Sequence, residues 1–550
     1  MKLFIAQINP TVGDIEKNSR LIVKAIEQAK EAQASLVVFP QMALTGYPPH
    51  DLLRNRAFTA AISEAWHTIA EACQGLKAIV GSPIVCQEDE EETLYNGAVL
   101  LSHTEKAEII PLQASALHDH SWFAASDYFI NNGSAIASAI TCEDYKVILS
   151  IDDEILDEEF ASLAQQEKQS GNKQILAINL AARPFISGQW KQHVALLQQR
   201  AQELGVHILE ANLVGGQDQI ILEGGSLLIS NQGQLLHYAP RFHEYCHLWT
   251  LSSQSTTQSM PLPAEDEKWA KESELAEAIC LGLGDYMRKN GFTDVVLGIS
   301  GGIDSALCAA LAVKTLGSEH VHGIYMPSRF STDISEEEGA KLCRSLGIDL
   351  QLLPIEGPRA AFTELLAPAF AGRSFDITEE NIQARIRAIL VMAMSNKFGW
   401  LAICTGNKAE EAVGYSTLYG DGAGGIAPIM DLYKNEVRSL CRYLNKDKEI
   451  IPSLIITRPP SAELHEGQKD SDSLPDYDVL DAMLKAYLEE GHTKAELKAE
   501  GFDEAMVEKV IRLVERSEFK RQQGPIGLKL SPMLLGLDRH MPITKGIRAL

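Results

Sequence analysis

The segment Gly298 to Ser305, GISGGIDS, concentrates residues whose types and spacing could do chemistry. It follows the apolar run VVL and precedes a second apolar run with helical spacing, so it falls between a predicted strand and a predicted helix. Its first five residues match GxSxG, which would make Ser300 a nucleophile. The same place suits a phosphate-binding turn, in which backbone N–H groups and a helix N-terminus converge on an anion. A glycine-rich turn without chemical function is the third interpretation.

The residues that follow the serine favour phosphate binding. Asp304 and Ser305 lie at the start of the predicted helix, where a carboxylate can hold Mg²⁺ and hydroxyls can donate to phosphate oxygens. A serine hydrolase would also need a positioned histidine and acid, and no motif supplies them. No GxxxxGK[ST] occurs in the chain, which excludes a Walker-type loop. A serine hydrolase using Ser300 and a non-catalytic nucleotide-binding module are kept as remote alternatives.

A second glycine-rich segment, GDGAGG from Gly420, matches the dinucleotide fingerprint GxGxxG. No predicted strand precedes it, and no strand-helix-strand unit surrounds it. We therefore discount a Rossmann dinucleotide fold and interpret the segment as a mobile loop over the site. Asp421 in this loop is as well explained by a turn cap as by a role in binding.

Five segments in the second half carry a family resemblance. SGGxDS after a strand resembles the signature of the PP-loop ATP pyrophosphatases, which cleave ATP between the α- and β-phosphates and adenylate a substrate. The segment from Thr378 to Val437, with RPPSAEL at Arg458, DSLPDYDVLD at Asp472 and FKRQQGPIGLK at Phe519, resembles the NAD⁺ synthetase family. The resemblance implies adenylation of the nicotinate carboxylate of deamido-NAD⁺, displacement of AMP by ammonia, and release of pyrophosphate.

The resemblance also assigns residues to the two substrates and the metal. The ATP phosphates would be wrapped by the loop, and Thr405 would contact ATP. Asp304 and Glu410 would bind Mg²⁺, which with cationic side chains would stabilise the departing pyrophosphate. The loop consists of Gly298, Ile299, Ser300, Gly301, Gly302, Ile303, Asp304 and Ser305. The positions matched to deamido-NAD⁺ are Asn381, Glu410 and Lys520, with Arg387 and Lys408 as weaker matches.

The first half resembles the nitrilase-like glutamine amidase domain of two-domain NAD⁺ synthetases. The likeness is carried by NPTVGDIEKNSRLI, MALTGYPPHDLL, TCED at Thr141 and NLVGGQDQIILEGGSLL at Asn212. It implies a Glu-Lys-Cys triad, in which a thiolate attacks the amide of L-glutamine, a glutamate moves the proton and a lysine stabilises the intermediate. Cys142 matches the nucleophile.

The other amidase positions depart from the family pattern. The general-base glutamate falls on Gln41, whose amide cannot accept a proton, and loss of a general base costs about 10²–10⁴-fold in rate. Lys106 is near the triad lysine but one residue out of register. SASPF becomes AARPF, which places Ala181 and Arg183 where two serines lie in the family. We therefore expect an inactive or impaired amidase and free ammonia as the nitrogen source; the alternative is a fully glutamine-dependent enzyme with unusual amidase residues.

The elements that must position these residues form two domains. In the first half, short β-rich runs mix with helical stretches, and the resemblance implies a nitrilase-like αββα sandwich over 1–250. The polar, proline-containing stretch 251–266 is the predicted linker. Over 267–550, strands alternate with helices, which predicts a doubly wound parallel sheet of the PP-loop, adenine nucleotide alpha hydrolase-like type. From Asp476 the pattern is mostly amphipathic helix.

The bulk composition limits partners and location. A chain of 550 residues is too long for one hydrophobic core, and its formal net charge of −25 argues against nucleic acid or an acidic membrane surface as a partner. Nine cysteines without a CxxC pair suit a reducing cytoplasm. We find no predicted membrane span and no signal peptide. The family resemblance implies a homo-oligomer.

Overall fold

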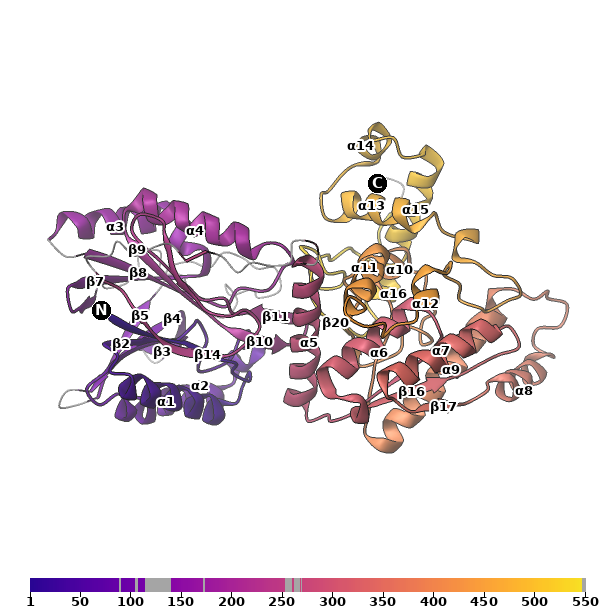
Figure 1. The fold of residues 1–550 in the computed structure, drawn as a ribbon, viewed down its shortest axis with the longest axis horizontal. Helices are drawn as coiled ribbons and strands as arrows, with labels where there is room; N and C mark the ends of the chain where they lie inside the picture. The colour runs from indigo at the N-terminus through magenta and orange to yellow at the C-terminus, as the bar shows by residue number, and fades with distance from the viewer. Residues whose placement is uncertain are drawn as a thin grey trace. The chain divides into compact units, whose positions relative to one another are not determined.

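The computed structural model describes residues 1–88, 91–103, 107–113, 140–171, 174–252, 260–261, 268 and 270–546. The chain divides into two compact units, Met1–Glu265 and Asp266–Leu550, each with its own core (Figure 1). Most of the predicted linker, 251–266, lies outside the described residues, so its bounds stay a prediction.

The N-terminal unit contains two six-stranded sheets, ordered β14-β1-β2-β3-β4-β5 and β13-β12-β9-β8-β7-β6. In each sheet the central strands are parallel, β1 to β3 in the first and β7 to β9 in the second. The strands of the first sheet are β1 (Lys2–Gln7), β2 (Leu36–Val38), β3 (Lys77–Glu88), β4 (Glu91–His103), β5 (Ala107–Gln113) and β14 (Tyr245–Thr250). Those of the second are β6 (Ile140–Cys142), β7 (Tyr145–Ile151), β8 (Gln174–Ala181), β9 (His207–Asn212), β12 (Leu227–Ile229) and β13 (Leu235–Tyr238). A separate hairpin joins β10 (Val214–Gln217) to β11 (Ile220–Glu223).

The side chains along each strand alternate between two faces, and this alternation places each sheet between a helical layer and the other sheet. In β1, Leu3 and Ile5 belong to the core between the sheets, whereas Phe4 and Ala6 pack beneath helices. The helices α1 (Ile15–Glu31) and α2 (Arg56–Ala72) cover the first sheet, and α3 (Glu158–Gln169) and α4 (Trp190–Leu204) cover the second (Figure 1). The predicted αββα sandwich is confirmed.

The C-terminal unit is built on a four-stranded parallel sheet of order β17-β16-β15-β18. Its strands are β15 (Val295–Gly298), β16 (Val321–Tyr325), β17 (Leu350–Leu352) and β18 (Leu401–Ala402). The helices α6 (Ile303–Leu316) and α7 (Asp333–Leu346) connect the first three strands, and α8 (Glu356–Leu366) and α9 (Ile377–Phe398) lead back to β18 on the other side of β15. The predicted doubly wound sheet is confirmed, and the strand order reverses between β15 and β18, where such sheets bind ligands at their carboxyl ends.

Helices make up most of the remaining unit. The helix α5 (Ala270–Asn290) packs against α6, and Ile386 and Val391 of α9 cover Val296 and Ile324 of the sheet. The helices that follow are α10 (Lys408–Val413), α11 (Lys434–Leu444), α12 (Ser453–Thr457), α13 (Tyr477–Leu488), α14 (Lys494–Ala499), α15 (Glu504–Arg516) and α16 (Glu518–Arg521). A short parallel pair joins β19 (Ile426–Ala427) to β20 (Ile526–Gly527).

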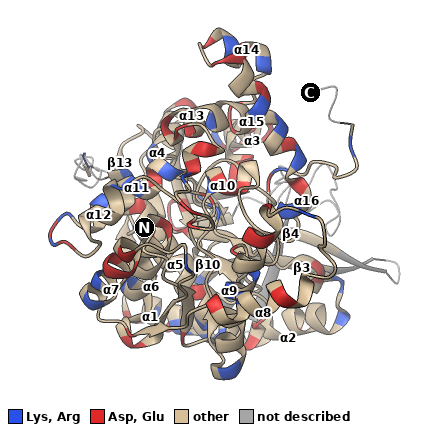
Figure 2. Ribbon diagram, turned by 90° about the vertical axis from the view of Figure 1, so that its right-hand side faces the viewer, with Lys and Arg blue, Asp and Glu red and all other residues tan. Residues whose placement is uncertain are grey.

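Basic and acidic residues are interspersed along the chain despite the acidic total. Figure 2 shows the Lys and Arg positions scattered among the Asp and Glu positions along the ribbon in this view. Among the described helices, none combines the length and the apolar character that crossing a membrane requires.

Candidate functional site

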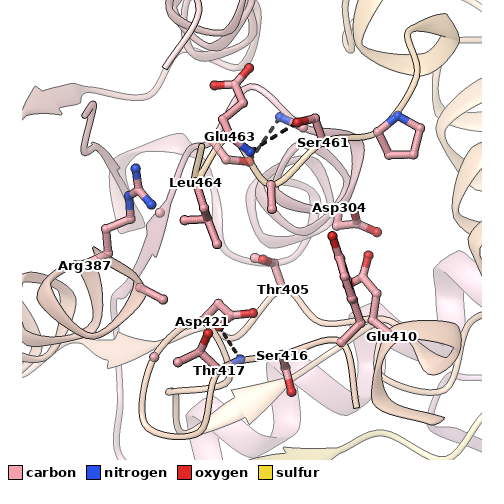
Figure 3. Close-up of a pocket in the computed structure, with 18 of the residues that line it drawn as sticks. Asp304, Arg387, Thr405, Glu410, Ser416, Thr417, Asp421, Ser461, Glu463 and Leu464 are labelled. Atoms are coloured by element: carbon pink, nitrogen blue, oxygen red, sulfur yellow. Dashed lines mark hydrogen bonds between the residues drawn. The ribbon is translucent and has the colours of Figure 1, made fainter. Parts of the chain in front are cut away.

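A cavity of about 650 Å³ lies at the carboxyl ends of β15, β16 and β18. Gly298 ends β15, Met326 follows β16 and Thr405 follows β18, so the cavity occupies the point where the strand order reverses. Other walls come from α9, from the loop after α10 and from the segment after α12 (Figure 3). The sheet therefore brings together most of the residues that the sequence analysis assigns to ATP and deamido-NAD⁺.

The loop between β15 and α6 requires glycine at position 301. Gly301 has φ +73, and a Cβ there would lie 2.4 Å from the backbone oxygen of Ser335. Gly302 is the N-cap of α6, and no side chain caps the first amides of this helix in the described structure. The backbone N–H groups and the positive end of the helix dipole are therefore left for an anion.

The two loop serines bond to each other and to the loop backbone. Ser300 Oγ accepts from the Gly302 N–H at 3.1 Å and lies 3.1 Å from Ser305 Oγ. Ser305 Oγ donates to the Gly302 carbonyl at 3.0 Å. None of the described residues that line the cavity is a histidine, so Ser300 lacks the base that a serine hydrolase needs. The geometry disfavours the remote hydrolase alternative.

The predicted metal ligands share one ammonium group. Lys434 Nζ lies 2.7 Å from Asp304 Oδ2 and 2.9 Å from Glu410 Oε1, and Asn407 donates to Asp304 at 2.9 Å. Burial raises the pKa of Glu410; Lys434 lowers that pKa and the nearby Asp304 raises it further. Figure 3 shows Asp304 and Glu410 next to each other on one side of the cavity, opposite Arg387.

These carboxylates suit Mg²⁺. Two carboxylates against one ammonium leave a negative site, and hard oxygen donors are the ligands that this ion prefers. In the described part of the chain, no cluster of three or more metal-binding side chains occurs. Phosphate oxygens and water would therefore have to complete the coordination shell.

The residues matched to deamido-NAD⁺ converge on the same cavity with one exception. Asn381 and Arg387 line it from α9, and Lys520 lines it from α16. Asn381 Oδ1 accepts from the Thr417 hydroxyl at 2.8 Å, and Arg387 Nε donates to the Met326 carbonyl at 3.1 Å. Burial lowers the pKa of both cations. Their contact with substrate stays a prediction.

Lys408 is the exception, and the structure corrects its assignment. It does not line the cavity; its side chain is 1% exposed and lies 2.9 Å from Asp431 and 2.7 Å from Glu489. It also donates to Ser531 Oγ and to the Met533 carbonyl. Lys408 therefore connects α10 to the C-terminal segment and serves structure.

The sequence analysis missed several charged residues of the cavity, among them Lys434, Arg458 and Asp470, although each of these lies in or near a segment that carries the resemblance. Lys434 starts α11, Arg458 follows α12, and Asp470 accepts from the Tyr477 hydroxyl at 3.0 Å. A lysine or arginine in such a segment could have indicated a site residue. The residues that Lys434 and Arg458 contact lie far away in sequence, so the local pattern did not identify them. Asp421 caps its own loop, since its Oδ1 accepts from the Thr417 N–H at 2.7 Å (Figure 3).

In the N-terminal unit, the structure does not bring Cys142 and Gln41 together. Glu143, the residue after Cys142, lies 3.4 Å from the N-terminal amine of Met1 and hydrogen-bonds to Ser35, so Cys142 is at the amino ends of β1 and β2. Gln41 follows the carboxyl end of β2, at least roughly 15 Å further along the sheet. The assignment of Cys142 as the nucleophile of a site with Gln41 is therefore corrected; its buried thiol has a raised pKa and belongs to the core between the sheets.

A nucleophile that acts together with Gln41 would have to lie at the carboxyl end of a strand. Asp152 lies at such an end, directly after β7. It has φ +46, and its carboxylate accepts from the Ala182 N–H at 2.9 Å at the end of β8. Burial raises the pKa of Asp152 to about 7. Burial also raises the pKa of Tyr47 in the loop after Gln41, and the charge of Asp152 raises it further. Gln41 is fully buried, and among the described residues neither of its side-chain polar atoms finds a hydrogen-bond partner. Lys106, the third predicted member, lies outside the described residues.

Arg183 belongs to a buried ion cluster at the same strand ends. Its guanidinium lies 2.7 Å from Glu210 and contacts His193, and His193 Nε2 lies 2.9 Å from Glu210. Burial opposes ionisation of Glu210, but Arg183 and His193 outweigh it and hold its pKa below the usual value. The arginine that replaces a small family residue is thus fixed by a structural ion pair.

Two family models match the chain in the order of its two units. The carbon-nitrogen hydrolase model covers residues 3–258, and the NAD synthase model covers residues 275–524. A glutamine-dependent NAD(+) synthetase of Synechocystis sp. is 38% identical over 98% of this chain and 98% of its own length. The enzyme of that name from Thermotoga maritima is 36% identical over 99% of this chain and 98% of its own length.

Solved structures agree over the full length. The glutamine-dependent NAD⁺ synthetase of Acinetobacter baumannii, in complex with ADP, has a TM-score of 0.77 and 32% identity, covering 100% of this chain and 99% of its own. A glutamine-dependent NAD(+) synthetase from Cytophaga hutchinsonii has a TM-score of 0.83 at 22% identity, covers 99% of this chain and 98% of its own, and supports the fold alone.

Proposed function

The chain belongs to the glutamine-dependent NAD(+) synthetase family, and we propose that it converts deamido-NAD⁺ to NAD⁺ at the cavity beside Gly298–Ser305. Unlike those relatives, it would take its nitrogen from free ammonia. It is an NAD⁺ synthetase, an ATP-dependent carbon–nitrogen ligase. The proposal concerns the nitrogen source, the metal and the work of individual residues.

The chemistry explains the arrangement of the loop. A carboxylate is a poor electrophile, so ATP converts it to a mixed anhydride with AMP, and ammonia then displaces AMP. Pyrophosphate leaves with concentrated negative charge, which preorganised N–H donors and cations stabilise. The open N-terminus of α6 and the hydroxyl of Ser300 would receive these phosphates, whereas Ser305 is buried and its hydroxyl donates to the Gly302 carbonyl.

Asp304 and Glu410 would hold Mg²⁺ at the phosphate end of the cavity. The ion, when bound, neutralises phosphate charge and orients the leaving group. Lys434 bridges the two carboxylates, and Asn407 fixes the rotamer of Asp304. Asn381, Arg387 and Lys520 line the cavity and would orient deamido-NAD⁺.

The observation that carries the nitrogen source is that Gln41 follows the carboxyl end of β2 and Asp152 follows the carboxyl end of β7. The amide of Gln41 cannot accept a proton, so it cannot be the general base that amide hydrolysis by this family uses. The carboxylate of Asp152 cannot replace the thiolate nucleophile. Cys142 lies at the opposite end of the strands. With neither group in place, glutamine hydrolysis would be lost, and ammonia must reach the synthetase cavity from solution.

A glutamine-fed synthetase is the second candidate, and the comparisons favour it. Relatives named glutamine-dependent are 36–38% identical over nearly the whole chain. This candidate requires a nucleophile and a base other than Cys142 and Gln41.

The test is NAD⁺ formation from deamido-NAD⁺, ATP and Mg²⁺, with ammonium or L-glutamine as the sole nitrogen source. The proposal expects a rate with ammonium and none above background with glutamine, with AMP formed in step with NAD⁺. Comparable rates with both sources would contradict the ammonia proposal and support the second candidate. Absence of NAD⁺ and AMP with either would contradict the synthetase assignment of this cavity.

The proposal extends to assembly and location. The pair α8 and α9 exposes several large apolar side chains, which a second copy of the chain would cover: Phe362, Leu365, Ile377, Ile389, Met392 and Phe398. These exposed side chains support the proposal of a homo-oligomer through the C-terminal units. A cytoplasmic location fits the eight described cysteines, which are all free thiols.

A further inference from the structure

We infer that Arg458 is a positioning residue that holds the ATP-binding loop in the shape that receives phosphate, an inference that rests on the proposed function. Arg458 directly follows α12 and begins a segment that continues to Gln468, which we name the 458–468 segment. Much of this segment lines the cavity: Arg458, Pro460, Ser461, Ala462, Glu463, Leu464 and Gln468. Nothing in the local pattern of RPPSAEL indicates what its arginine contacts.

The guanidinium of Arg458 joins the loop to a neighbouring helix. Its Nη2 donates to the Gly301 carbonyl at 2.7 Å, and its Nη1 donates to Ser335 Oγ at 3.0 Å. Ser335 is fully buried in the first turn of α7, and its backbone oxygen is the atom that a Cβ on Gly301 would strike. Arg458 therefore bonds both elements at the point where they pack most closely.

Holding the Gly301 carbonyl also orients the groups that face the phosphates. In a planar trans peptide, the C=O of Gly301 and the N–H of Gly302 point in opposite directions. That N–H donates to Ser300 Oγ, which in turn lies 3.1 Å from Ser305 Oγ. Because glycine allows many backbone conformations, Gly301 does not fix this peptide by itself. The external hydrogen bond from Arg458 supplies the missing constraint.

The same segment is anchored a second time through Glu463. This carboxylate accepts from the Ser335 hydroxyl at 2.6 Å, from the Thr332 hydroxyl at 2.9 Å and from the Thr332 N–H at 3.2 Å. Ser335 Oγ thus lies between the cation of Arg458 and the anion of Glu463. Glu463 adopts φ +51, and its own N–H donates to Ser461 Oγ at 3.2 Å (Figure 3). The two anchors give the segment one fixed path beside the loop.

Without this constraint, the Gly298–Ser305 loop adopts the shape that binds ATP for only part of the time. Apparent affinity falls in proportion to the competent fraction, whereas saturating ATP selects the competent shape. Arg458→Met should therefore raise the KM and the Kd for ATP about tenfold, with kcat and the KM for deamido-NAD⁺ within threefold of wild type. A lysine can donate to one of the two acceptors but cannot hold both in a fixed fork, so Arg458→Lys should recover only part of the affinity.

The experiment measures ATP binding to the full chain by calorimetry in the presence of Mg²⁺, together with steady-state rates using ammonium. Arg458→Met and Arg458→Lys are compared with Arg512→Met, which removes an exposed arginine on α15 and should bind ATP as wild type does. An ATP Kd within twofold of wild type for Arg458→Met would overturn the inference. So would a kcat that falls more than the affinity and is fully restored by Arg458→Lys, because that pattern indicates direct contact of a charge with the reacting phosphates.

A second variant covers the case in which Arg458→Met does not fold. Glu463→Gln weakens the other anchor and should raise the ATP Kd in the same direction by a smaller factor, about threefold; an unchanged Kd overturns the inference. The calorimetric readout does not depend on turnover. If the wild-type chain binds ATP but forms no NAD⁺, the proposed function fails, while the comparison of Kd values still decides the role of Arg458.

Discussion

Asp304 and Glu410 share the ammonium of Lys434, and this small cluster is where single residues matter most. Glu410→Gln removes one negative ligand and leaves Lys434 with one anion. We expect the rate of NAD⁺ formation to fall about 10²–10³-fold, as for loss of one preorganised stabilising group, and the Mg²⁺ concentration for half-maximal rate to rise. Titration of the rate with Mg²⁺ checks both effects.

The matched control for that variant is Glu411→Gln. Glu411 is the next residue on α10, is more deeply buried than the partly exposed Glu410, and does not line the cavity. If the two variants showed the same Mg²⁺ dependence, Glu410 would have no special relation to the metal.

For variants of Gln41 and Cys142, we expect results opposite to those that an intact Glu-Lys-Cys triad would give. Gln41→Glu restores a carboxylate but provides no thiol at the end of β7, where Asp152 stands, so the variant should release no glutamate from L-glutamine. Cys142→Ala should leave NAD⁺ formation with either nitrogen source unchanged. A quantitative glutamate assay measures both effects. Two results would place the thiol back in the mechanism: glutamate release by Gln41→Glu, or glutamate release by the wild type that Cys142→Ala abolishes.

At the scale of elements, the Arg183–Glu210 pair fixes the ends of β8 and β9 against α4. Arg183→Met leaves a fully buried carboxylate with His193 and the amide of Asn179 but no arginine, and removing one partner of a buried pair costs about 3–5 kcal/mol. In wild type the pKa of Glu210 is lowered, so the pair stabilises the fold above the unfolded carboxyl pKa of about 4.3 and loses this contribution as the pH falls through the folded value. In the variant, burial raises that pKa, so the penalty shrinks as the pH falls.

The free energies of unfolding of wild type and Arg183→Met should therefore differ most near pH 7 and converge toward pH 4.5. Urea unfolding at several pH values measures the difference. Adding Glu210→Gln to the variant removes the buried charge and should restore part of the stability at pH 7. A difference that stays constant with pH would show that the arginine acts through packing alone.

Local patterns predicted the elements well, because strand, glycine turn and helix in Val295–Leu316 are adjacent in sequence. They missed Lys434 and Arg458, whose partners lie 130 and 157 residues away. Lys408 shows the reverse error: a lysine beside a binding motif was taken for a ligand, yet residues 81 and 125 positions later bury it. Cys142 was misplaced because TCED matched locally, whereas the strand direction that separates it from Gln41 is a property of the whole sheet.

At the scale of the whole molecule, the apolar face of α8 and α9 predicts self-association. Light scattering on the full chain should give a mass of at least two chains, that is, twice 60.3 kDa. Leu365→Lys combined with Ile389→Lys should lower the mass toward one chain, because two charges on this face would have to be desolvated in the interface. A wild-type mass of one chain at micromolar concentration would contradict a stable assembly through this face.

The nitrogen source is the central claim, and an isotope competition tests it most directly. The full chain is given deamido-NAD⁺, ATP and Mg²⁺ with ¹⁵N-ammonium and unlabelled L-glutamine together, and the mass of the NAD⁺ product is measured. Because Gln41 and Asp152 replace the base and the nucleophile of an amidase, we expect every NAD⁺ molecule formed to carry ¹⁵N in its amide and no glutamate to be released. Unlabelled NAD⁺ formed in step with glutamate would contradict the account and show that the N-terminal unit hydrolyses glutamine by residues other than Cys142 and Gln41.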